Sequence, residues 1–237
     1  THPRCFLSPD GYRDAYFGNL LEMGVESEGK PLILALLMER PFQQLKKLKN
    51  LEYPVLIWPM ECCLTLPSLV ACILRSLRSA LGPLKVSGDM EVDGYDLSHL
   101  VKGTVNEGRR SGEFFLNLRI YYCAKWLSRK IRIDRCVYPY ENRSWEKMLL
   151  LGMGHGSPDT HLTGYQHASL TPSHTNFILS HEEANITPLP DVILNTGTVI
   201  SQRLENEGNY PAGMLYTACA LRQGQSGQTQ MKKRPQH

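Results

Sequence analysis

Two short segments of the chain carry side chains that could perform acid–base chemistry. In the first, YPYENRSWE (138–146), a predicted strand ends at a proline turn, and the carboxylate of Glu141 follows. In the second, GYQHAS (164–169), the imidazole of His167 follows another predicted strand. A carboxylate or an imidazole in such a place can accept the proton of a substrate hydroxyl. Glu141 and His167 are therefore the predicted catalytic residues.

Each of these residues has a simpler interpretation. Glu141 could cap the helix predicted to begin near Ser144, because the N-terminal end of a helix favours negative charge. His167 could be a histidine of an ordinary surface loop. Other histidines lie nearby, but their spacing matches no helical ligand pair such as HExxH, so no metal is predicted. The segment MGHG (153–156) lacks the lysine of a phosphate-binding loop and is predicted to form a turn.

Strands and helices are predicted to alternate around these segments. Apolar runs predict strands over residues 31–38, 53–58, 132–139, 161–165 and 190–197, the first of which could also be a buried helix. Helical spacing predicts helices over residues 12–23, 42–48, 67–77, 114–126, 145–151 and 199–207. The apolar stripe within 67–77 is expected to pack internally, and residues 85–101 are expected to hold loops and one short helix. This order predicts an α/β fold, a Rossmann-like open parallel sheet with helices on both faces, which binds ligands beyond the carboxyl ends of its strands.

Composition limits the classes of protein to consider. The chain has 237 residues, and its formal net charge of +3 comes from 26 basic and 23 acidic side chains, a balance too even to favour nucleic acid as a partner. Its seven cysteines form no CxxC pair, which favours a reducing compartment over a disulfide framework. Because neither a membrane span nor a signal peptide is recognisable, the predicted location is cytoplasmic.

The two chemical segments resemble a known family. YPYENRSWEKM (138–148) and GYQHAS (164–169) are similar to the YPFEN-x-x-WEK and GYQHS motifs of bacterial surface-carbohydrate (O-antigen or capsule) biosynthesis proteins, which are glycosyltransferase-like. YFGNL (16–20), NTG (195–197), YP (210–211) and ALR (220–222) follow in the order of that family. The chain differs at Tyr140, where the motif has Phe, and at Ala168, which precedes Ser169.

The resemblance implies the N-terminal, acceptor-side half of a GT-B glycosyltransferase. Residues 1–207 would form the Rossmann-like domain, 208–222 a linker or the start of a truncated second domain, and 223–237 a disordered tail. The enzyme would transfer a sugar from a nucleotide-sugar donor to a glycan acceptor without a cofactor or metal, and a lipid-linked acceptor would bring it to the inner face of a membrane. Carried over by motif, the substrate-binding residues are Asn142, Trp145, Glu146, Gln166 and Arg222. A noncatalytic module that binds glycans or partners and a nucleotide-sugar epimerase-like protein are the alternatives.

Overall fold

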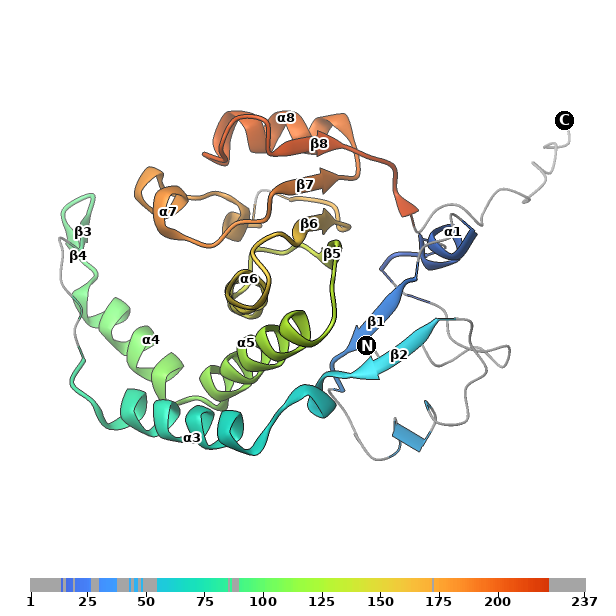
Figure 1. The fold of residues 1–237 in the computed structure, drawn as a ribbon. Coiled ribbons are helices and arrows are strands. Elements are labelled where there is room, and N and C mark those ends of the chain that lie inside the picture. Colours follow the sequence, from blue (N-terminus) through green and yellow to red (C-terminus); the bar gives the residue numbers. More distant parts are fainter. Residues whose placement is uncertain are drawn as a thin grey trace, which may run out of the picture. The chain divides into compact units, whose positions relative to one another are not determined.

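The chain is an α/β protein with parallel sheets (Figure 1), as the alternation of elements predicts. The computed structural model describes residues 14, 16–18, 20–26, 30–37, 43, 45–46, 48, 55–84, 86, 90–171 and 173–221. The chain divides into two compact units, each assembled from separate segments. The first comprises Thr1–Met60, Arg135–Glu141 and His161–His237, and the second comprises Glu61–Asp134 and Asn142–Thr160. Within the described part of the chain, no helix has the length and apolar character needed to cross a membrane.

A four-stranded parallel sheet is the main element of the first unit. Its strands follow one another in space in chain order: β5 (Arg135–Pro139), β6 (His161–Gln166), β7 (Val192–Asn195) and β8 (Leu215–Thr217). Because all the strands run in the same direction, their carboxyl ends meet at one edge of the sheet. We call this the carboxyl edge. The pairing of Pro139 with Tyr165 and of Gln166 with Asn195 lies at this edge.

The remaining elements of the first unit are short. In chain order they are α1 (Leu20–Glu26), β1 (Leu32–Ala35), β2 (Leu56–Pro59), the 3-10 turn η3 (Thr175–Phe177), α7 (His181–Ile186) and α8 (Thr198–Glu207). β1 and β2 form a separate parallel pair, and α8 packs against β7 and β8. Buried Ile193 on β7 and buried Leu204 on α8 belong to the core of this unit.

The second unit is mainly helical. After the 3-10 turn η2 (Met60–Cys63), which begins at the unit boundary, it contains α3 (Leu66–Leu81), the hairpin strands β3 (Glu91–Val92) and β4 (Tyr95–Asp96), α4 (Ser98–Arg110), α5 (Gly112–Lys130) and α6 (Ser144–Gly156). Thr65 caps α3, because its side chain accepts a hydrogen bond from the N–H of Ser68. α5 and α6 pack along each other, and their contact holds the centre of this unit.

The glycines of α6 allow this close helix packing. A Cβ atom at Gly152 would lie 2.5 Å from the carbonyl oxygen of Tyr121 and 2.8 Å from the Cβ of Ala124, both on α5. A Cβ at Gly156 would overlap the side chain of Ser128. The predicted turn at residues 153–156 is therefore wrong: the glycines lie inside a helix because they bring two helices together.

Most of the predicted elements are confirmed, and the differences have physical causes. β1, β2, β5, β6, β7, α3, α5, α6 and α8 lie where the sequence predicts them. The helix predicted from residue 12 begins only at Leu20, because Asp14 forms a turn with Tyr16 and Phe17. The segment 208–222, predicted as a linker or the start of a second domain, contains β8, and residues 181–186, where no element was predicted, form α7. Within the predicted helix 42–48, residues 43, 45, 46 and 48 are described and are helical, whereas the predicted disordered tail lies outside the described residues.

The apolar stripe of α3 is the clearest correction. Val70, Ile73, Leu74 and Leu77 are all exposed rather than packed. The helix turns its small and polar face inward instead, with Cys72 as its buried residue. The periodicity identified the helix correctly but did not tell which face is buried.

Candidate active site

Glu141 and His167 meet at the carboxyl edge of the four-stranded sheet. Nε2 of His167 lies 3.6 Å from an Oε1 of Glu141, just beyond the length of a direct hydrogen bond. The two side chains come from the ends of neighbouring strands, β5 and β6. The side chain of His167 is only 5% exposed, whereas that of Glu141 is 34% exposed. The carboxylate is therefore the member of the pair that solvent, or a substrate, can reach.

The backbone before Glu141 is fixed by the neighbouring strand and by packing. The N–H of Tyr140 donates to the carbonyl of Tyr165, and the side-chain amide of Asn176 donates to the carbonyl of Glu141. Tyr140 is buried and lies against the backbone of Gly164, where a Cβ would come within 3.0 Å of the Cβ of Tyr140 and 3.1 Å of its ring. These contacts fix the backbone position from which the side chain of Glu141 projects.

The hydroxyl of Tyr140 explains how a tyrosine fits where the related motif has phenylalanine. It lies 3.0 Å from the hydroxyl of Tyr210, so the extra polar atom is hydrogen-bonded in the interior. The ring also packs edge-on against Phe177. The substitution therefore adds a link between the end of β5 and the segment before β8.

A tyrosine missed by sequence reasoning also contacts the imidazole. The rings of Tyr16 and His167 make an edge-to-face contact with 4.7 Å between their centroids. A carboxylate oxygen of Asp14 accepts hydrogen bonds from the N–H groups of Tyr16 and Phe17, at 2.7 and 2.8 Å, and Gly18 has a φ of 53°. An aspartate two residues before an aromatic, followed by a glycine, is a turn signal that could have identified this segment.

Gln166 supports the loop that carries His167. It is fully buried; its amide N–H donates to the carbonyl of Ala168, and its carbonyl accepts from the hydroxyl of Thr196 at 3.4 Å. These bonds join the end of β6 to the residue after β7. The structure therefore gives Gln166 a role in holding the edge, and its role as a substrate ligand stays a prediction.

A second polar group, also missed by sequence reasoning, lies where β7 and β8 end. The side-chain amide of buried Asn195 donates to the hydroxyl of Ser201 at 3.2 Å, and that hydroxyl lies 2.8 Å from the hydroxyl of Thr217. The N–H of Ala218 donates to the carbonyl of Asn195. These bonds fix the first turn of α8 against the ends of two strands. In the sequence, the NTG motif at 195–197 could have pointed to this polar group.

Three further predicted site residues belong to the second unit. Asn142 has a φ of 54°, a left-handed conformation that asparagine adopts more readily than most residues, and so turns the chain sharply after Glu141. Its N–H donates to an Oε2 of Glu146 at 3.0 Å. Glu146 is 1% exposed, and Trp145 is half-buried. Glu146, in the first turn of α6, therefore holds the residue that precedes the N-cap Arg143, and Glu141 is not the cap of this helix.

The last predicted substrate ligand, Arg222, lies outside the described residues. The structure therefore brings together Glu141, His167 and Gln166 from the predicted set and adds Tyr16. Comparisons with protein-family models, with curated proteins and with solved structures gave no significant match. A functional interpretation of the carboxyl edge therefore depends on its residues and their geometry.

Proposed function

We propose that this protein is a glycosyltransferase-like protein that passes a sugar from a nucleotide-sugar donor to a glycan acceptor, using Glu141 and His167. The observation that carries the proposal is the 3.6 Å approach of these two side chains at the carboxyl ends of parallel strands. This edge is where α/β proteins with open parallel sheets bind their ligands. A Rossmann-like domain of GT-B type is part of the same proposal, supported by the parallel order of β5 to β8.

In this mechanism Glu141 accepts the proton of the acceptor hydroxyl. The hydroxyl oxygen forms a bond to the anomeric carbon of the donor sugar, the bond from that carbon to the phosphate oxygen breaks, and the nucleotide leaves with the electron pair. The greater exposure of Glu141 supports its contact with the acceptor. The imidazole of His167, which lies close to Glu141 and contacts the ring of Tyr16, positions the carboxylate.

Binding of a donor is the first test. Isothermal titration calorimetry with UDP-, GDP- and CMP-sugars should reveal one nucleotide sugar that binds, and release of its nucleotide in the presence of glycan acceptors should reveal turnover. Binding of a glycan without any donor would instead support the noncatalytic alternative. Absence of both would contradict a role in sugar transfer.

The substitution Glu141→Gln tests the chemistry. It keeps the size of the side chain but removes the proton acceptor, so turnover should fall by roughly 100-fold or more. Glu205→Gln, on the exposed surface of α8, is the matched control and should retain full turnover. Equal turnover of wild type and Glu141→Gln would show that the carboxylate does not accept the proton.

A further inference from the structure

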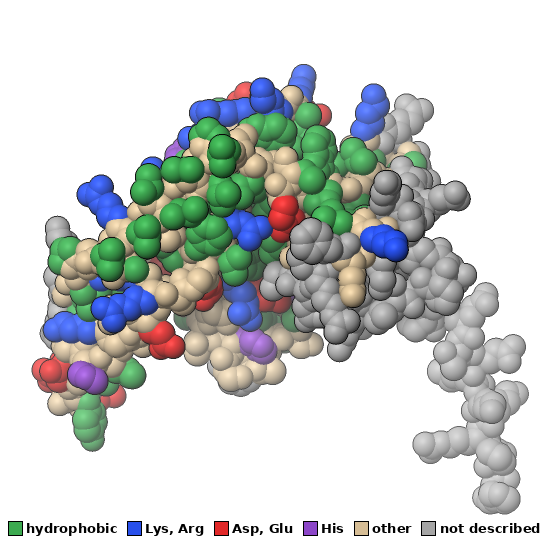
Figure 2. All heavy atoms as spheres, turned by 90° about the horizontal axis from the view of Figure 1, so that it is seen from below, with side chains coloured by type: hydrophobic (Ala, Val, Ile, Leu, Met, Phe, Trp, Pro, Cys, Tyr) green, Lys and Arg blue, Asp and Glu red, His purple; other side chains and the backbone are tan. Residues whose placement is uncertain are grey.

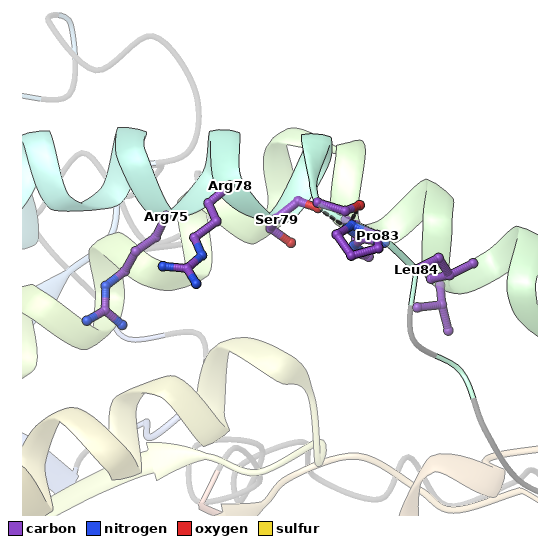
Figure 3. A pocket seen from close by; sticks show the side chains of 8 residues that line it. Arg75, Arg78, Ser79, Pro83 and Leu84 are labelled. Carbon is purple, nitrogen blue, oxygen red and sulfur yellow. Dashed lines mark hydrogen bonds between the residues drawn. The ribbon is translucent and has the colours of Figure 1, made fainter.

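A hollow in the second unit is lined by three arginines from two helices. Arg75 and Arg78 extend side by side from α3 (Figure 3), and Arg109 reaches the hollow from α4. The volume of the hollow is about 570 Å³, within the range of small-molecule sites. We call it the arginine hollow. All of its lining residues belong to the second unit, so its geometry does not depend on the sheet that carries the carboxyl edge.

Arg109 is fixed at the C-terminal end of α3. Its Nη2 donates hydrogen bonds to the carbonyls of Ser79 and Gly82. Both bonds use the same nitrogen, and a guanidinium also carries N–H groups on Nε and Nη1, so those groups can donate to a ligand. One guanidinium of the hollow is therefore held in place before any ligand binds.

Arg75 and Arg78 have no comparable structural role. Both are exposed, and within the described part of the chain neither forms a salt bridge. The lining of the hollow contains no acidic residue, so it does not neutralise the three guanidinium charges. Such a concentration of positive charge favours an anion that carries more than one negative charge.

Basic and apolar side chains occur together on the surface around α3. Figure 2, which views the molecule from the side of α3, shows hydrophobic side chains gathered together with lysine and arginine side chains beside them. In the arginine hollow the apolar part comes from Pro83 and Leu84, after the end of α3, and from Val105 of α4, all of them exposed. A ligand that fits the hollow therefore combines an anionic group with a compact apolar group.

We propose that the arginine hollow binds a small, soluble phosphate ester. Its phosphate oxygens accept hydrogen bonds from Arg75, Arg78 and Arg109, because the planar guanidinium group matches the geometry of a phosphate. Its organic group lies against Leu84 and Val105. A carboxylate would carry only one negative charge and leave more of the basic charge uncompensated. This inference does not depend on sugar transfer at the carboxyl edge.

Titration with phenyl phosphate tests the proposal. Phenyl phosphate joins a doubly charged phosphate to a flat apolar ring, whereas inorganic phosphate lacks the ring and benzoate carries a single charge. In the ¹⁵N-labelled full chain, phenyl phosphate should shift the Nε–H signals of Arg75 and Arg78, and the shifts should saturate. It should bind about fivefold more tightly than inorganic phosphate or benzoate, since it alone offers both groups.

Substitutions in the lining should change the affinity for phenyl phosphate in a defined pattern. Arg75→Gln/Arg78→Gln should weaken binding by roughly 25-fold, since each arginine contributes about fivefold. Val105→Ser should weaken the binding of phenyl phosphate about threefold but leave that of inorganic phosphate unchanged. The matched control Arg110→Gln/Arg132→Gln removes two exposed charges of the same unit outside the hollow. It should bind like the wild type at about 0.15 M salt, which screens distant charges.

Folding and the source of the phosphate have separate controls. Circular dichroism should show unchanged helix content in Arg75→Gln/Arg78→Gln, because both substituted side chains are exposed. Equal affinity of the wild type and this double variant would overturn the proposal, as would an equal loss in Arg110→Gln/Arg132→Gln. Flotation with vesicles that contain phosphatidic acid, without binding of any soluble probe, would assign the phosphate to a lipid and so also contradict a soluble ligand.

Discussion

Two glutamates five residues apart in one motif have opposite environments. Glu141 is partly exposed and faces His167, whereas Glu146 is 1% exposed and accepts the N–H of Asn142. The two carboxylates lie close together in the sequence, Glu141 in the loop after β5 and Glu146 in the first turn of α6, and the sequence does not show which of them is buried. The left-handed turn at Asn142 separates them. The prediction of Glu141 at the carboxyl edge rested on its being the first carboxylate after β5.

The two glutamates should therefore differ in their effect on stability. Glu146→Ala removes a buried carboxylate that accepts the partly buried N–H of Asn142, so the free energy of unfolding should fall by about 1–3 kcal/mol. Glu141→Ala removes a partly exposed group and should change it by less than about 1 kcal/mol. Urea denaturation followed by circular dichroism measures both. A larger loss for Glu141→Ala than for Glu146→Ala would reverse the roles assigned to them.

At the scale of elements, the helices α5 and α6 show how glycine positions can be misinterpreted. The segment MGHG was predicted to form a turn because it lacks the lysine of a phosphate-binding loop, and its glycines also have low helix propensity. In the structure Gly152 and Gly156 face α5, whereas a Cβ at Gly154 would have no atom within 4 Å. The reason for the two packed glycines lies on another helix, more than 20 residues earlier, and could not be seen locally.

Alanine substitutions should separate the two kinds of glycine in α6. Gly152→Ala forces a Cβ against the backbone of Tyr121, so the free energy of unfolding should fall by about 1–3 kcal/mol. Gly154→Ala enters open space within a helix and should raise it by about 0.5–1 kcal/mol. Thermal denaturation would show the two melting temperatures moving in opposite directions. Equal destabilisation by both would mean that α6 does not pack on α5 through Gly152.

An element can be predicted from the sequence when the pattern that defines it lies within the element itself. The strands that end at Glu141 and His167 are apolar runs closed by proline or a polar loop, so their type and approximate bounds were predictable. β8 is three residues long, and its identity depends on pairing with β7, which local sequence does not encode. Tyr16 reaches His167 from more than 140 residues away in sequence. Such contacts require the three-dimensional arrangement.

At the scale of the whole molecule, the cysteines differ in how deeply they are buried. Cys63 and Cys123 are each 1% exposed in the second unit, whereas Cys62 and Cys219 are exposed. All six cysteines within the described ranges are free thiols. Burial, with smaller contributions from the neighbouring Cys62 and Glu61, raises the pKa of Cys63 from 9.0 to about 11, and burial chiefly raises that of Cys123 to about 12.

These raised pKa values predict a loss of stability in alkali. Above pH 9 the thiols of the unfolded chain ionise while the buried thiols stay protonated, so the unfolded state releases protons and the free energy of unfolding falls up to pH 11. The slope should be about 1 kcal/mol per buried thiol for each pH unit. Urea denaturation between pH 8 and 10.5 measures it. Cys63→Ala/Cys123→Ala should reduce the slope but not abolish it, because burial also raises the pKa of Cys136 to about 11. Cys219→Ala, at an exposed thiol, should leave the slope unchanged. An unchanged slope in the double variant would mean that these thiols ionise in the folded protein as readily as in the unfolded chain.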